Sequence, residues 1–118
     1  MRGELYACRT GGSNKYYLVI GENSSCSAYY GRIEALARGN TSNQYAYPKS
    51  VASQVTKKQR GWRKKGDDYQ LVFVETGSEE ELLDCAKQWA RKGAYTMAEP
   101  TATLKPVLVT SGWFNNGD

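Results

Sequence analysis

The segment 48–65 (PKSVASQVTKKQRGWRKK) constrains the fold most, because a helix cleanly separates its apolar residues from its charges. At 100° per residue, Val51, Val55 and Trp62 fall on one stripe. The opposite side carries positive charge from Lys49, Lys57, Arg60 and Lys64. Pro48 suits the first turn, and Gly66 followed by two aspartates suits the end. The pattern predicts a helix over about 48–65 with one face in a core and the other basic.

The rest of the chain shows strand patterns and one further helix pattern. Strands are expected at 4–9, 15–20, 26–33 and 68–75, with a short one at 45–47 and another at 104–110. Apolar residues on both faces of 68–75 predict a central strand, with Leu71 and Phe73 sharing one face. Ser78 and Glu81 form a capping box for a helix over 79–92, which Gly93 ends. Residues 38–47 are expected to form a mostly polar loop.

These elements predict one α+β domain over residues 1–114 of the 118-residue chain, followed by a frayed tail at 115–118. Its fold is an antiparallel sheet of four to five strands with two helices.

Composition excludes several classes of function. The chain has no histidine and only 3 cysteines, which removes Ser/His and Cys/His catalysis and most zinc sites. No spacing of Asp and Glu singles out a metal-dependent nuclease. The odd number of cysteines and the absence of a signal peptide favour the reducing cytoplasm, with Cys8, Cys26 and Cys85 as buried apolar residues. No apolar run approaches the ~20 residues that cross a bilayer. We therefore expect a non-enzymatic cytoplasmic protein with no metal or cofactor.

The first candidate site is a basic patch centred on the first helix. It comprises Lys49, Lys57, Lys58, Arg60, Arg63, Lys64 and Lys65. Several cations on one rigid surface suit phosphates, because each contact releases counterions. The net charge of +4 and a pI near 9.0 agree with such a partner. The same pattern also fits the solvated face of an amphipathic helix, and both interpretations stay open.

Two smaller sites combine aromatic rings with arginine. In the first, Tyr29, Tyr30 and Arg32 lie near Arg38 and the following Gly-Asn, a set that suits a nucleotide or a strand end. The alternative is ordinary strand packing, since tyrosine favours half-buried strands. The second is 60–63, where Trp62 either stacks on a base or, as its apolar stripe favours, packs beneath the helix. Gly61 weakens this last turn by about 1 kcal/mol relative to Ala.

The order of features from about Lys15 to Tyr69 resembles a WGR domain. The matching residues are Tyr30-Gly31-Arg32-Ile33 for the Trp-Gly-Arg strand, Gly39-Asn40 in the loop, Tyr47, and the helix end Lys64-Lys65-Gly66. The resemblance implies an antiparallel sheet crossed by one helix, and DNA binding. It also implies that Tyr30 stacks on the nucleic acid and that Arg32 contacts phosphate.

The leading hypothesis is a small protein that binds nucleic acid, with DNA favoured over RNA, through its basic helix and aromatic strand surface. The alternative is a phage-type inhibitor or adaptor that docks on an acidic host-protein surface, or that sequesters a nucleotide signal. A homodimer is left open. Salt separates these hypotheses, because nucleic-acid binding weakens steeply with salt and an apolar-centred protein contact weakens less.

Overall fold

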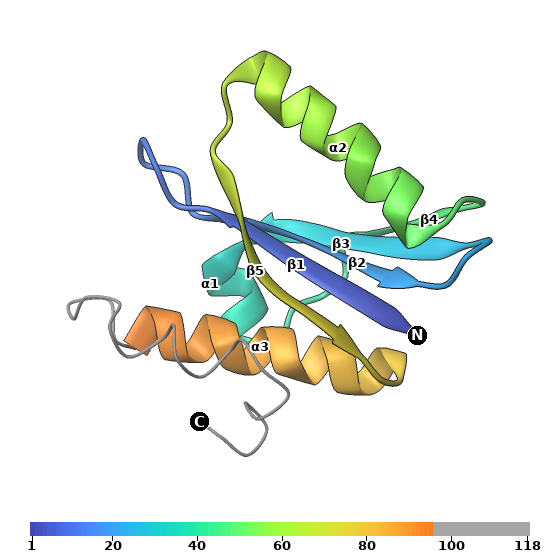
Figure 1. Cartoon of the computed structure of the whole chain (residues 1–118). Helices are drawn as coiled ribbons and strands as arrows, with labels where there is room; N and C mark the ends of the chain where they lie inside the picture. Colours follow the sequence, from blue (N-terminus) through green and yellow to red (C-terminus); the bar gives the residue numbers. More distant parts are fainter. Residues whose placement is uncertain (96–118) are drawn as a thin grey trace.

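The computed structural model describes residues 1–95 and has the α+β fold that the sequence predicts (Figure 1). Its sheet is antiparallel and five-stranded, in the order β4-β3-β2-β1-β5. The strands are β1 Arg2–Cys8, β2 Lys15–Gly21, β3 Cys26–Arg32, β4 Gln44–Tyr47 and β5 Tyr69–Thr76. The helices are α1 Ile33–Ala37, α2 Val51–Lys65 and α3 Glu79–Tyr95. The predicted strand at 104–110, the domain end at 114 and the tail at 115–118 lie outside the described residues.

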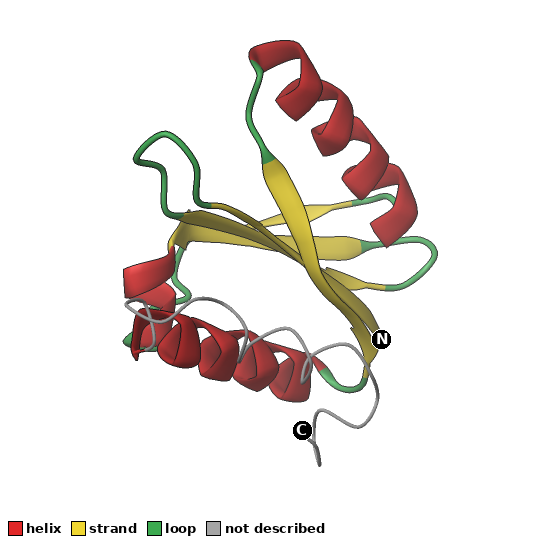
Figure 2. Cartoon of the chain, turned by 60° about the vertical axis from the view of Figure 1, so that its left-hand side comes forward, coloured by secondary structure: helices red, strands yellow, loops and turns green. Residues whose placement is uncertain are grey.

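The sheet is a middle layer between helices. Helix α2 lies over one side, and α1 and α3 lie against the other (Figures 1 and 2). Each side has its own apolar cluster, because successive residues of a strand point in opposite directions. In β2, for example, Leu18 belongs to the α3-side cluster and its neighbour Val19 to the α2-side cluster. Both faces of the sheet are therefore covered by helices, and the alternating side chains of its strands pack into two separate apolar cores.

The first three strands pair in chain order as an antiparallel meander. Strands β1 and β2 are joined by a turn in which Gly11 and Gly12 have φ of 57° and 81°. Backbone in this left-handed region favours glycine, which explains the Gly-Gly pair. Strand β3 pairs with β2 through its full length, but it ends at Arg32. The prediction that the strand includes Ile33 is therefore wrong by one residue.

Ile33 instead begins α1, a five-residue helix that the sequence pattern does not predict. Ile33 and Leu36 are buried one turn apart in the α3-side cluster. Arg91 of α3 donates a hydrogen bond from Nε to the Ala37 carbonyl oxygen at 2.8 Å, which ties the end of α1 to α3. Strand β4, Gln44–Tyr47, confirms the short strand predicted at 45–47 and begins one residue earlier, so the polar loop is limited to 38–43.

Among residues 1–95, the segment 68–75 is not the central strand that the sequence predicts. Within residues 1–95, β5 pairs with β1 alone and lies at the end of the sheet. The pairing register shifts there, with Leu5 opposite Phe73 and Tyr6 opposite Leu71, so that Val72 is an extra residue in a β-bulge. Phe73 consequently faces the α3-side cluster, whereas Leu71 lies on the α2 side of the sheet.

Helix α3 begins as predicted and ends later. The Ser78 hydroxyl accepts a hydrogen bond from the Glu81 backbone N–H, and the Glu81 carboxylate accepts one from the Ser78 backbone N–H. This reciprocal pair is the predicted capping box. The helix continues to Tyr95, so the prediction that Gly93 ends it is wrong. Of the apolar face that the helical period predicts, Leu82, Ala86, Trp89 and Ala90 are buried and Leu83 is partly buried. Cys85 is buried as well.

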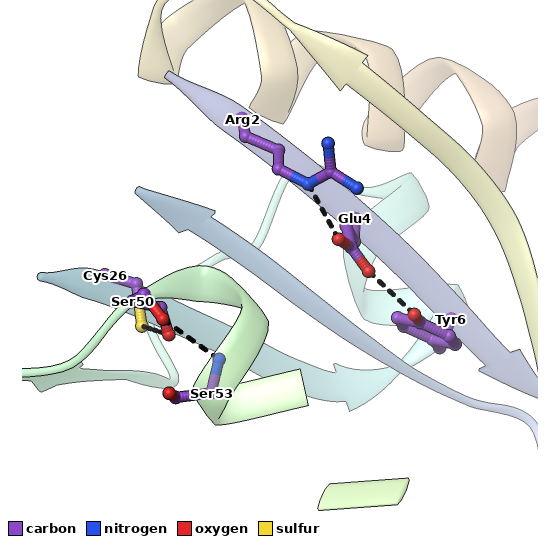
Figure 3. Close-up of polar contacts among 6 residues, drawn as sticks. All are labelled: Arg2, Glu4, Tyr6, Cys26, Ser50 and Ser53. Atoms are coloured by element: carbon purple, nitrogen blue, oxygen red, sulfur yellow. Dashed lines mark hydrogen bonds and ion pairs between the residues drawn. The ribbon is translucent and has the colours of Figure 1, made fainter. Parts of the chain in front are cut away.

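Helix α2 starts at Val51, three residues after the predicted start at Pro48. The start is set by Ser50, whose hydroxyl accepts a hydrogen bond from the Ser53 backbone N–H at 3.0 Å (Figure 3). The Cys26 thiol donates to the Ser50 carbonyl oxygen at 3.9 Å, which joins the helix start to β3. Gly66 ends the helix with φ of 79°, as predicted.

One acidic group is buried on the α2 side of the sheet. The Glu4 carboxylate accepts hydrogen bonds from the Tyr6 hydroxyl at 2.7 Å and from Arg2 Nε at 2.8 Å (Figure 3). Burial and this bond to Glu4 raise the pKa of Tyr6 well above its ordinary value. The three side chains satisfy one another, so the carboxylate leaves the basic residues of α2 unneutralised. The cysteines at 8, 26 and 85 are all buried, as predicted.

Candidate nucleic-acid interface

Among residues 1–95, the basic residues of α2 form no ion pair. The helix contains no acidic residue between Val51 and Lys65. Within residues 1–95, the ion pairs join Arg2 to Glu4 and Arg32 to Glu34, so neither involves α2. The positive charge that the sequence places on this helix is therefore available to an external anion.

The helix is oriented as its apolar stripe predicts. Val51, Val55 and Trp62 are buried against the sheet. Trp62 is 7% exposed, and its ring stacks on Tyr69 with 4.1 Å between centroids. The alternative that Trp62 stacks on a base is therefore not supported, because the ring already has protein partners.

The opposite side of α2 forms an outer basic ridge, which consists of Lys57, Arg60 and Lys64. All three are exposed, and steps of three and four residues place them in one line along the helix. Arg63 and Lys65 are also exposed in the last turn, where the helix dipole favours positive charge. The ridge is straight and rigid over two turns, which suits repeated phosphates.

Two predicted members of the basic patch lie elsewhere. Lys49 precedes α2, so the prediction that it lies opposite the apolar stripe is wrong; its Nζ is 5.9 Å from the centre of the Tyr47 ring. Lys58 leans toward the sheet, with Nζ 4.8 Å from the centre of the Tyr17 ring. Four residues earlier, Gln54 donates from Nε2 to the Tyr17 hydroxyl at 2.8 Å, so Lys58 lies on the same flank of the helix.

The environment of Lys58 is strongly positive. Burial lowers the pKa of its ammonium group, and the charges of Lys65 and Lys57 lower it further, while Asp67 opposes the change. Lys57 and Lys65 thus act electrostatically on Lys58. An anion that bound beside them would relieve this repulsion.

The second predicted site corresponds to an open hollow of about 470 Å³ at the end of β3. Its lining includes Tyr30, Arg32 and Arg38 together with Asn40 and Asn43. The structure thus brings Tyr30, Arg32 and Arg38 together, as predicted, with the loop that contains Asn40.

The hollow also contains one acid. The Glu34 carboxylate lies 3.4 Å from Arg32 Nε. Its pKa is lowered first by a hydrogen bond from its own backbone N–H, and then by Asn14 and by the Arg32 charge. Arg32 is therefore partly neutralised, whereas Arg38 forms no ion pair within residues 1–95.

Tyr29 does not belong to this site. It is buried on the α3 side of the sheet, where its hydroxyl donates to Glu79 and accepts from Gln44 Nε2 at 3.2 Å. Tyr30 therefore lines the hollow, whereas the neighbouring Tyr29 does not.

Tyr45 is an exposed ring that the sequence argument did not place at a site. It is 60% exposed, lies opposite Ala28 and therefore faces the α2 side of the sheet, and its ring centre is 4.9 Å from that of Tyr47. The spacing of Tyr45 and Tyr47 could have predicted this pair, because residues two apart in a strand lie on the same face.

Comparison with known proteins gives no relative: no family model, curated protein or solved structure matches the chain. The WGR resemblance therefore stays a prediction. Within residues 1–95, no three Cys, Asp or Glu side chains gather as metal ligands would. None of the helices in this part of the chain is long and apolar enough to cross a bilayer.

Proposed function

We propose that this protein is a non-enzymatic, cytoplasmic nucleic-acid-binding protein that uses α2 as its main contact surface. The observation that carries the proposal is the outer basic ridge of Lys57, Arg60 and Lys64, held rigidly and without acidic partners among the described residues. Nucleic acids are the polyanions whose regularly spaced phosphates best match a straight row of cations. DNA remains favoured over RNA only through the WGR resemblance.

The burial of Trp62 supports the proposal indirectly. Because the stripe formed by Val51, Val55 and Trp62 is used against the sheet, α2 has one orientation and its cations have one direction. A loosely attached basic segment would bind anions with a larger entropic cost.

The salt dependence of binding tests the proposal. Each phosphate contact to duplex DNA contributes roughly 0.9 to the slope of log K against log salt, so the three ridge residues together contribute about 2.7. Replacing Arg60 and Lys64 by Gln should reduce the slope by about 1.8 and weaken binding, with the fold retained. Fluorescence anisotropy of a labelled 16-base-pair duplex between about 50 and 200 mM salt measures both quantities.

A matched control removes the same charge from the other side of the molecule. The variant with Lys87→Gln and Lys92→Gln also lowers the net charge from +4 to +2, because two positive charges are lost in each pair. Binding that fell equally in both variants would show that only total charge matters. Binding that survived the loss of Arg60 and Lys64 with an unchanged slope would refute the use of α2.

The hollow beside β3 favours a second candidate function, the sequestration of a free nucleotide. Arg32 and Arg38 lie there with Tyr30 around a volume of about 470 Å³, which lies within the usual range of small-molecule sites. Calorimetric titration with mononucleotides distinguishes the two functions. Micromolar affinity for a nucleotide, lost in Arg38→Gln, would favour sequestration over binding of a polymer.

A further inference from the structure

We propose that the nucleic acid bound by this protein is single-stranded, with its bases stacked on Tyr30 and Tyr45 and its phosphates along the adjoining flank of α2. This inference rests on the proposed function and specifies the class of nucleic acid. It starts from the two tyrosines that the fold leaves in solvent.

The exposure of these two rings is unusual for this protein. Tyr30 and Tyr45 are 44% and 60% exposed. The other tyrosines whose burial is described are buried or partly buried: Tyr6, Tyr16, Tyr17, Tyr29, Tyr47 and Tyr69. Large exposed aromatic rings cost solvation free energy and are characteristic of surfaces that bind another molecule.

The two rings lie on the same surface. Tyr30 pairs with Tyr17, and Tyr45 pairs with Ala28, so all four side chains face the α2 side of the sheet. Tyr30 and Tyr45 are thus diagonal neighbours on β3 and β4, with Cα atoms roughly 7–8 Å apart. Together with Tyr47, they form a tyrosine row that leads from the start of α2 toward the end of β3.

Cations line the tyrosine row. Lys58 Nζ lies 4.8 Å from the ring centre of Tyr17, the cross-strand partner of Tyr30. At the other end, Lys49 Nζ lies 5.9 Å from the Tyr47 ring centre. Beyond Tyr30, Arg32 follows on the same side of β3 and pairs with Lys15 of β2. A strand of nucleic acid laid along this row would find Lys49 at the Tyr47 end and Arg32 two residues beyond Tyr30.

The flank of α2 that contacts Tyr17 is open at one position and basic toward its C-terminal end. Gln54, Lys58, Gly61 and Lys65 follow one another at steps of four, three and four residues, so they share that flank. A Cβ atom added at Gly61 would meet no heavy atom within 4 Å. The flank therefore combines positive charge with an open position.

A single strand fits this arrangement better than a duplex. Bases inside a duplex are stacked on one another and offer no face to a protein ring, whereas unpaired bases do. Proteins that bind single strands without strong sequence preference combine aromatic platforms with a positively charged groove. Exposed aromatic rings and positive charge are both present here on one side of the sheet.

The test compares labelled dT12, rU12 and a 12-base-pair duplex by fluorescence anisotropy. We expect the single strands to bind more tightly than the duplex. Stacking on one base contributes about 1–3 kcal/mol, so Tyr30→Ala and Tyr45→Ala should each weaken single-strand binding by roughly fivefold or more. Tyr30→Phe and Tyr45→Phe keep the rings and should bind within about twofold of the unaltered protein.

Two controls separate stacking from other effects. Leu71→Ala removes an exposed apolar side chain from the same side of the sheet at its far end, and it should leave binding unchanged. The slope of affinity against salt should also stay the same in the tyrosine variants, because the phosphate contacts remain. Thermal melting of each variant verifies that the fold is retained.

The outcomes distinguish this inference from the proposed function. Equal affinity for duplex and single strand, with no effect of Tyr30→Ala or Tyr45→Ala but a steep salt slope, would overturn the single-strand inference and leave the proposed function standing. Absence of salt-dependent binding to all three oligonucleotides would overturn both. A preference for rU12 over dT12, or the reverse, would support the inference and assign the sugar.

Discussion

Replacement of Trp62 by Ala should detach α2 from the sheet at a large and measurable cost in stability. Trp62 is 93% removed from solvent, and its ring centre lies 5.4 Å from that of Tyr6, 5.6 Å from that of Tyr17 and 4.1 Å from that of Tyr69. A buried tryptophan hides about 200 Å² of surface, which at about 25 cal/mol per Å² amounts to about 5 kcal/mol. Tryptophan-to-alanine changes in cores cost about 3–5 kcal/mol, so about 4 kcal/mol is expected here.

Urea unfolding followed by circular dichroism measures this cost. At about 4 °C per kcal/mol, the melting temperature should fall by about 15 °C. Tyr30→Ala is the matched control, because it removes an exposed ring from the same side of the sheet and should cost less than about 1 kcal/mol. A loss below about 1 kcal/mol for Trp62→Ala would refute the argument that this ring fastens α2 to the sheet.

Three further predictions concern stability. Gly61→Ala should raise the free energy of unfolding by about 1 kcal/mol in urea titrations, because α2 is continuous there and a Cβ meets open space; a destabilised variant would contradict this. Ser50→Ala should cost about 1 kcal/mol in the same assay, since the Ser53 backbone N–H loses its acceptor, whereas Ser50→Asp should retain most of the stability. Burial raises the pKa of Tyr16 to about 12, so folding favours the neutral phenol; the resulting stability is complete below about pH 10 and is lost as pH rises through about 12. Alkaline unfolding monitored by circular dichroism should therefore shift to higher pH in Tyr16→Phe, and an unchanged midpoint would count against this origin of the pH dependence.

Much of the fold follows from local patterns. The meander of β1, β2 and β3, the two long helices and the capping box at Ser78 are all encoded by residues close together in the sequence. Helix α1 is not predicted, because five residues are too few to display a helical period, and its burial depends on α3, which lies more than forty residues later.

The position of β5 could not be read from its own residues. Apolar side chains on both faces normally mark a central strand, but Val72 is a bulge residue and places two consecutive apolar residues, Val72 and Phe73, against the α3-side cluster. Leu71 and Val74 are left 53% and 39% exposed on the other side, where α2 does not cover them. A bulge depends on the register with β1, which a single strand does not reveal.

The helical period predicts which side chains of α2 are exposed and which are buried. It does not predict which residues of the sheet they contact. The ridge of Lys57, Arg60 and Lys64 and the burial of Trp62 follow from the 100° step. The position of Lys58 over Tyr17 does not, because it depends on how α2 packs over β2.

The extra residue in β5 also affects how the molecule behaves at high concentration. A regular strand at the end of a sheet has unpaired backbone N–H and C=O groups with which a strand of another chain can pair. A bulge disrupts the regular spacing of these groups and so disfavours that pairing. Deleting Val72 would leave Leu71 and Phe73 facing their present sides while making the strand regular. Among residues 1–95, the bulge therefore keeps Phe73 in the core and makes β5 a poorer template for a strand of another molecule.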